Sequence, residues 1–141
     1  MAEILSFHYE VDGSDFTAAG QASVAVKKSL RELGIDPDII RRVSIAMYEG
    51  EINMVIHARG GVADVYVTEE HIKIVLTDEG PGIENVDLAM QEGYSTAPAN
   101  VRSLGFGAGM GLPNMKRYTD LMKIESVVGQ GTTITMTVNL V

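Results

Sequence analysis

Polar side chains recur every four residues at Glu49, Asn53 and His57. In an α-helix this spacing places them on one face, about one turn apart. A carboxylate in such a row can act as a general base toward a hydroxyl or water, and an amide oxygen is a ligand that Mg²⁺ accepts beside phosphate oxygens. A solvated helix face has the same spacing, so the row alone does not decide its role. Glu51 points roughly 200° away from Glu49 on the helical wheel, which predicts a surface residue.

A second candidate is Asp78, which directly follows the apolar run 72–77 and precedes Gly80 and Gly82. A carboxylate at a strand end can accept a hydrogen bond from an exocyclic amine such as adenine N6. Glycines beside it let the backbone approach a base closely. Asp, Gly and Pro are also common turn residues, so an ordinary turn remains the alternative. The hydroxyl of Thr132, at the start of the last apolar alternation, is expected to lie beside Asp78.

Glycines alternate through the segment 105–111, at positions 105, 107, 109 and 111. This density favours main-chain N–H groups gathered around an anion, most simply phosphate, at the start of a helix near Gly111. Met110 occupies the place where a dinucleotide fingerprint needs Gly or Ala, and no Gly-Lys pair exists for a P-loop. A flexible linker is the alternative interpretation.

The elements that must position these residues follow from the hydrophobic periodicity. We expect a strand over 4–9, helices over 16–33 and 36–58, a hairpin of strands 62–67 and 72–76, a weakly patterned loop over 81–109 with a short helical stretch at 86–90, a helix from 112 to about 121, and a closing hairpin of strands 122–127 and 132–140. This order predicts a single domain over residues 1–141 with an α+β fold. It is a two-layer α/β sandwich whose mixed, mainly antiparallel sheet carries helices on one face.

Composition narrows the functional classes. The formal charge of −8 argues against nucleic acid as a partner, because phosphate backbones need a basic footprint. No apolar run approaches the roughly 18 residues of a membrane helix, and the start Met1–Ile4 does not resemble a secretory signal. With no cysteine there is no disulfide. We therefore expect a cytoplasmic protein without a membrane partner.

Together these signals form a pattern: Glu49-x-x-x-Asn53, Asp78-x-Gly80-x-Gly82, the glycine run ending at 111, and Gly131-Thr132. In this order the chain resembles a GHKL ATPase, the group that contains gyrase B, histidine kinases and MutL, over about residues 36–138. The resemblance implies a Bergerat-type ATP-binding fold and the cofactors ATP and Mg²⁺. It implies Glu49 as catalytic base, Asn53 as the ligand of nucleotide-borne Mg²⁺, and Asp78 as the acceptor of adenine N6. The further nucleotide-binding positions it implies are His57, Gly80, Gly82, Ile83, Gly105, Gly107, Gly109, Met110, Gly111, Leu112 and Thr132.

Within that superfamily the segment 48–57 is most similar to bacterial anti-sigma-factor serine/threonine kinases. A histidine kinase is disfavoured because no dimerising helix with a phosphoacceptor histidine precedes the domain, and gyrase-type and MutL-type enzymes need a further domain. The subgroup implies a protein partner, either an anti-sigma-factor antagonist or a sigma factor, and a homodimer. Two functions remain open: a kinase in which Glu49 deprotonates a partner serine, and an ATP-gated binding switch that transfers no phosphoryl group.

Overall fold

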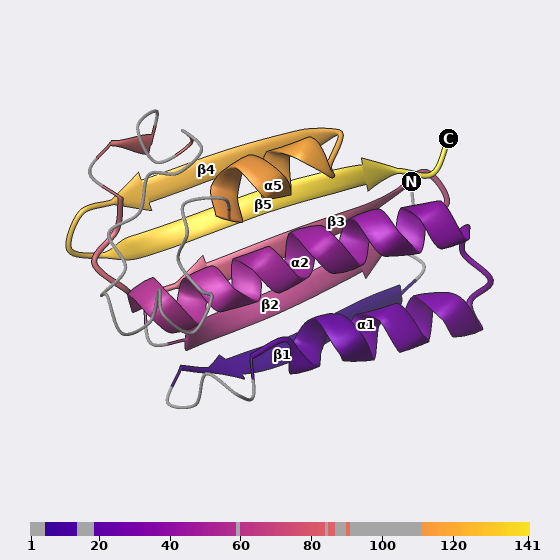
Figure 1. Cartoon of the computed structure of the whole chain (residues 1–141), viewed down its shortest axis with the longest axis horizontal. Coiled ribbons are helices and arrows are strands. Elements are labelled where there is room, and N and C mark those ends of the chain that lie inside the picture. Colours follow the sequence, from indigo (N-terminus) through magenta and orange to yellow (C-terminus); the bar gives the residue numbers. More distant parts are fainter. Residues whose placement is uncertain (1–4, 14–18, 59, 84, 87–89, 91–110) are drawn as a thin grey trace.

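The structure, a computed structural model, describes residues 5–13, 19–58, 60–83, 85–86, 90 and 111–141. Strands and helices follow one another as β1 (Leu5–Asp12), α1 (Gln21–Glu32), α2 (Pro37–Ala58), β2 (Gly60–Val67), β3 (His71–Asp78), α5 (Gly111–Arg117), β4 (Leu121–Val127) and β5 (Gly131–Asn139). Helices α1, α2 and α5 lie on one face of a five-stranded sheet, which confirms the expected α+β sandwich (Figure 1). Among the described residues, no helix is both long and apolar enough to cross a bilayer.

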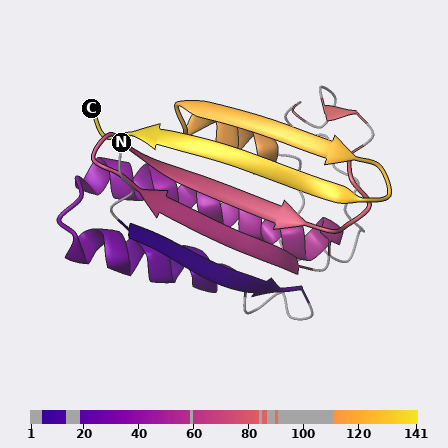
Figure 2. The same cartoon turned by 180° about the vertical axis from the view of Figure 1, so that it is seen from behind.

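The sheet order is β1-β2-β3-β5-β4, and each neighbouring pair is antiparallel. The expected mixed sheet is therefore antiparallel at every described pairing. The reason is that β3 and β4 run in the same direction but β5 lies between them, while α1 and α2 return the chain so that β2 opposes β1. From behind, the sheet shows a face that no described helix covers (Figure 2).

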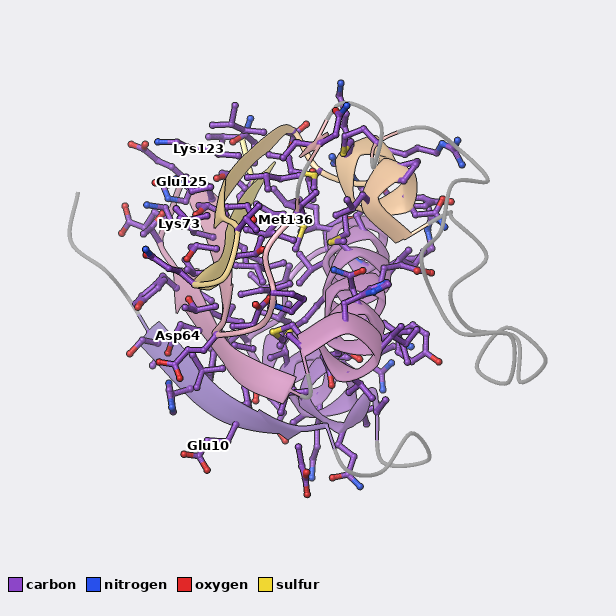
Figure 3. The ribbon with its side chains drawn as sticks, turned by 90° about the vertical axis from the view of Figure 1, so that its left-hand side faces the viewer. Glu10, Asp64, Lys73, Lys123, Glu125 and Met136 are labelled. Atoms are coloured by element: carbon purple, nitrogen blue, oxygen red, sulfur yellow. The ribbon has the colours of Figure 1, made fainter. Side chains whose placement is uncertain are left out.

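Side chains on the two faces of the sheet differ as the pleat requires. Lys73, Lys123, Glu125, Asp64 and Glu10 extend from the open face, whereas Met136 points between the sheet and the helices (Figure 3). The inner side chains of the strands and the apolar stripe of α2 together form the core. Its fully buried members include Val43, Met47, Val65, Ile72, Ile74, Leu76, Met115, Met136 and Val138.

Helix α2 begins and ends where the sequence indicates. The carboxylate of Asp36 accepts a hydrogen bond from the Asp38 backbone N–H at 2.9 Å, and Pro37 is the first helical residue. The helix ends at Ala58, and Gly60, with φ +109°, opens β2. A side chain at Gly60 would lie 2.1 Å from the Val11 carbonyl, so glycine here lets β2 pair with β1.

Helix α2 approaches the sheet closely at Gly50. A Cβ added there would lie 2.0 Å from the Leu76 Cδ1 atom of β3 and 3.5 Å from the Met115 sulfur of α5. Glycine costs a helix interior up to about 1 kcal/mol relative to alanine, so this position trades helix propensity for close packing. The sequence analysis did not identify Gly50 as a packing position.

Glu51 is not a surface residue, contrary to the prediction from the helical wheel. Only 2% of it is exposed. Its carboxylate accepts backbone hydrogen bonds from Gly20 at 3.0 Å, Ala22 at 3.2 Å and Ser23 at 2.6 Å. Helix α1 has no side-chain cap of its own, because Gly20 occupies the N-cap position. Glu51 therefore caps α1 from the neighbouring helix, an arrangement that helical spacing within α2 cannot reveal.

Other predicted boundaries also shift. The helix expected to reach residue 121 ends at Arg117, because the Asp120 N–H already donates to the Thr137 carbonyl at 2.8 Å and begins the β4–β5 hairpin. The first strand continues to Asp12 rather than ending at residue 9, because it pairs with β2 as far as Gly60. Helix α1 begins at Gln21, and residues 16–18 of the expected longer helix lie outside the described residues.

Replacing Glu51 by Gln tests the capping role. The substitution keeps the shape but turns a charged acceptor of three N–H groups into a neutral amide with one acceptor oxygen. We expect a loss of about 3 kcal/mol in the free energy of unfolding, measured by urea denaturation. The control is Glu32→Gln at the exposed end of α1, which should change stability by less than about 0.5 kcal/mol. Equal effects of the two substitutions would contradict the capping role.

Candidate functional site

Glu49 is half-buried on the side of α2 that packs against α5. A Cβ added at Gly111, the first residue of α5, would lie 3.7 Å from the Glu49 Oε2 atom. The side chain of Asn114, one turn further along α5, influences the pKa of Glu49. Burial raises the pKa of Glu49, and the Asn114 hydrogen bond opposes this by lowering it. The carboxylate is thus held at the junction of the two helices.

Asn53 and His57 continue the row along α2 as expected, and both are half-buried. His57 lies close enough to Asp78 for the two side chains to interact electrostatically. Burial lowers the pKa of His57, and the Asp78 charge partly offsets this by raising it. The row that begins at Glu49 therefore ends at the acid of β3, so residues far apart in sequence are brought to one edge of the sheet.

Asp78 is the last residue of β3, and the main chain holds its carboxylate. The Oδ1 atom accepts hydrogen bonds from the Gly80 N–H at 2.9 Å and from the Thr132 N–H at 3.2 Å. Asp78 and Thr132 are also register partners in the β3–β5 ladder, which confirms that Thr132 lies beside Asp78. Both bonds engage Oδ1, and among the described residues no hydrogen bond to Oδ2 is seen.

The two glycines after Asp78 are explained by packing within the protein. A Cβ at Gly80 would lie 2.6 Å from that of Ala58 at the end of α2. Gly82 has φ +78°, and a Cβ there would lie 2.6 Å from the Val127 carbonyl of β4. The Ile83 N–H donates to the Ser126 hydroxyl at 2.7 Å, which fastens the segment 80–83 to β4.

Two neighbours of the predicted site residues, Ser126 and Asn114, were not identified from the sequence. Ser126 is the register partner of Thr132, and their hydroxyl oxygens are 2.9 Å apart in a shared hydrogen bond. Asn114 was treated only as part of a helix, although it influences the pKa of Glu49. The available signal was weak in both cases, because one is a single serine in a strand and the other a single amide one helical turn after Gly111.

The remaining predicted residues fall into two groups. Leu112 is 7% exposed and belongs to the hydrophobic core, so its side chain helps to anchor α5. Gly105, Gly107, Gly109 and Met110 lie outside the described residues. No group of three or more His, Asp or Glu side chains suited to a metal ion is present among residues whose positions are described.

An antiparallel sheet with helices on one face, whose central helix carries a polar row leading to an acid at a strand end, is the architecture of histidine kinase-like ATPase domains. Residues 14–138 match the family described as "Histidine kinase-like ATPase domain", and the chain belongs to this family.

Curated relatives agree with this assignment, and a solved structure shares the fold. An anti-sigma F factor of Clostridium acetobutylicum is 35% identical over 120 residues, covering 82% of this chain and 80% of the relative. The serine/threonine-protein kinase RsbT of Bacillus subtilis is 32% identical over 124 residues, covering 85% of each chain. The fold is similar to the crystal structure of the RsbU and RsbW domains of Rv1364c from Mycobacterium tuberculosis, with a TM-score of 0.64 and 18% identity, over 95% of this chain and 31% of that one.

Gly129 in the β4–β5 turn and Gly131 at the start of β5 allow a test of whether close packing against Asp78 requires glycine. Gly129 and Gly131 both have positive φ, +83° and +134°, but a Cβ at Gly131 would lie 2.1 Å from the Asp78 carbonyl while Gly129 has open space. We expect Gly129→Ala to cost about 1 kcal/mol of stability and Gly131→Ala about 3 kcal/mol or more. Urea denaturation measures both. Similar losses would mean that backbone strain alone, and not contact with Asp78, requires glycine at 131.

Proposed function

We propose that this chain is an ATP- and Mg²⁺-dependent serine kinase that phosphorylates a serine on a small antagonist protein in a partner-switching pathway, with a sigma factor as a further partner. The observation that carries the proposal is the place of Glu49, half-buried beside α5 on the row that leads to Asp78. The names of the relatives support it, because one is an anti-sigma F factor and another a serine/threonine-protein kinase.

The adenine end of the proposed site is the corner formed by β3 and β5. Asp78 would accept a hydrogen bond from adenine N6 through Oδ2, since Oδ1 is engaged by the backbone of residues 80 and 132. Thr132 is buried beside Asp78. Its hydroxyl, which is hydrogen-bonded to the hydroxyl of Ser126, would support the base. An acceptor such as Asp78 would favour adenine over a base that carries a carbonyl at position 6. The carbonyl oxygen of that base would face the carboxylate oxygen of Asp78, and neither can donate a hydrogen bond.

The phosphate end would lie along α2. Asn53 offers an amide oxygen, the hard and neutral donor that Mg²⁺ accepts together with phosphate oxygens. Mg²⁺ bound with the nucleotide would offset the charge of the phosphates. Asn53 lies between Glu49 and His57 in the row, so a metal held there would be one helical turn from the proposed base.

The proposed reaction is an in-line displacement. Glu49 takes the proton of the partner's serine hydroxyl, and the serine oxygen forms a bond to the γ-phosphorus. The bond between that phosphorus and the β–γ bridging oxygen breaks, and ADP leaves. Burial favours this role, because it raises the pKa of Glu49 and so makes the carboxylate a stronger base than an exposed one.

We also propose one ATP-binding domain over residues 1–141 that acts in the cytoplasm as a homodimer, in keeping with the resemblance to anti-sigma-factor kinases. The glycines 105, 107 and 109 and Met110 are proposed to contribute to phosphate binding on the sequence pattern alone.

Asp78→Asn tests the nucleotide site. The substitution replaces the acceptor by an amide, so we expect the affinity for Mg²⁺-ATP to fall about 10- to 100-fold in isothermal titration calorimetry, the worth of one hydrogen bond to a charged group. Asp64→Asn, on the open face of the same sheet, should leave the affinity unchanged. Equal affinity of Asp78→Asn and the wild-type protein would remove Asp78 from the site.

Glu49→Gln tests phosphoryl transfer. The assay uses ATP labelled in its γ-phosphate and candidate antagonist proteins encoded by genes next to the gene of this protein. We expect the wild-type protein to transfer the labelled phosphate to a serine of one of them. The variant should be at least about 100-fold slower, because a general base contributes that much or more. Glu69→Gln, exposed in the β2–β3 turn, should keep the wild-type rate. ATP-dependent capture of a partner without label would favour the binding switch and refute the kinase.

A further inference from the structure

We propose that a hollow between α1 and α2, together with the cations that follow it along α1, is a docking site for the protein partner. The site fits a segment of the partner that presents one apolar side chain flanked by acidic residues. The inference deepens the proposed function and rests on it only for the existence of a protein partner, because docking requires no phosphoryl transfer.

The hollow lies where the two helices run side by side, and apolar groups line most of it (Figure 1). It has a volume of about 280 Å³ and is lined by Ala19, Gly20, Gln21, Val24 and Tyr48. Val24 of α1 is 67% exposed and Tyr48 of α2 is 40% exposed. Single exposed apolar residues are common on protein surfaces, but here two of them, from different helices, border one depression. Small-molecule sites measure roughly 300–1,000 Å³, so this smaller volume suits one inserted side chain.

Contacts within the protein hold the walls of the hollow in place. The Tyr48 ring lies directly against Gly20, since a Cβ added at Gly20 would lie 2.7 Å from the Tyr48 Cε1 atom. The N–H groups of Gly20 and Ser23 donate to the buried carboxylate of Glu51 at 3.0 Å and 2.6 Å. An inserted side chain therefore meets a preformed surface, which reduces the entropy lost on binding.

Basic residues continue from the hollow along the exposed face of α1. Lys28 and Arg31 follow Val24 at i+4 and i+7, so the three side chains share one face of the helix over about 10 Å. Both cations are exposed, and neither forms an ion pair with another described residue. Helix α1 carries three basic residues and one acidic residue, whereas the whole chain has a formal charge of −8. This local basic surface on an acidic protein favours an acidic partner segment.

A protein fits this surface better than a membrane or a nucleic acid. Those polyanions are bound by extended basic surfaces, and a chain with a formal charge of −8 repels them as a whole. A few cations beside an apolar hollow match a short protein segment, in which the apolar side chain is the anchor and the acids set the orientation. Tyr48 directly precedes Glu49, so the partner is bound on the helix that carries the proposed base.

The first test uses synthetic peptides and the isotope-labelled full chain. A short peptide with a central leucine between glutamates should shift the NMR signals of the Val24 methyl groups and the Lys28 amide at millimolar concentration. Two control peptides, one with lysines in place of the glutamates and one with serine in place of the leucine, should give shifts at least about fivefold smaller. Unshifted Val24 signals, or equal shifts with all three peptides, would overturn the inference.

Matched variants then show which groups bind the leucine peptide. Val24→Glu and Lys28→Glu change exposed residues, so both should fold normally, and each should weaken binding about fivefold or more. The controls are Val128→Glu, at a residue 59% exposed in the β4–β5 turn, and Lys73→Glu, on the open face of the sheet; both should leave binding unchanged. Controls that weaken binding as much as their counterparts would mean that net charge, and not the hollow, holds the peptide.

Further measurements on Val24→Glu separate the alternative occupants. Loss of a homodimer, detected by light scattering, would assign the hollow to a second copy of the chain. Sedimentation of the wild-type protein, but not of the variant, with phosphatidylserine vesicles would assign it to a membrane. A clear fall in melting temperature would assign it to residues 14–18 of the chain itself. We expect none of these changes, and any one of them would overturn the inference.

The proposed function and the docking site fail separately. With a candidate antagonist protein that is phosphorylated, Val24→Glu should raise the KM for the antagonist about fivefold or more and leave the affinity for Mg²⁺-ATP unchanged. An unchanged KM would refute the docking site while the kinase stands. If no antagonist is phosphorylated, the proposed kinase fails, and the peptide shifts still decide whether the hollow is a docking site.

Discussion

The close approach of α2 to the sheet at Gly50 determines the rest of the structure. With no Cβ at this position, the helix backbone rests against Leu76 of β3. A helix that approaches so closely has little freedom to rotate about its axis, so the directions of the residues on either side of Gly50 are fixed. Glu49 turns toward α5 and Glu51 toward α1. The rotation of one helix therefore sets both the candidate base and the position of its neighbouring helix.

The two carboxylates flanking Gly50 differ in what satisfies them. Glu51 is fully buried and accepts three backbone N–H bonds from the beginning of α1, so its charge is balanced by a helix terminus. Glu49 is only half-buried, and no hydrogen bond from a described backbone N–H to its carboxylate is seen. A buried carboxylate whose oxygens accept several backbone hydrogen bonds is occupied in holding the fold, whereas a partly exposed one can still be reached by a ligand. Glu49 and Glu51 are the same residue type. Their different surroundings give Glu51 a structural role and leave Glu49 available for the proposed chemistry.

Most of the helices and strands could be predicted from the sequence, because hydrophobic periodicity and capping residues are local. The limits of α2 follow from Asp36, Pro37 and the glycines after Ala58. The burial of Glu51 could not be predicted, because its partners lie about 30 residues earlier and depend on how two helices pack. The same holds for Ser126 and Asn114, whose partners come from other strands and helices. In the candidate site, residue types could be predicted, and the contacts that orient them could not.

The glycines around Asp78 acquire a different meaning in the folded chain. From the sequence, Gly80 and Gly82 suggested room for a ligand beside the backbone. In the structure, Gly80 lets the end of β3 meet α2, Gly82 lets the following segment meet β4, and Gly131 lets β5 begin directly against the Asp78 carbonyl. These three contacts bring the N–H groups of residues 80 and 132 to the Asp78 Oδ1 atom. The spacing of the motif is therefore the spacing needed to fix one carboxylate at a strand end. Its relation to a bound nucleotide is indirect, since the glycines shape the protein around Asp78, and Asp78 is the residue that would meet the base.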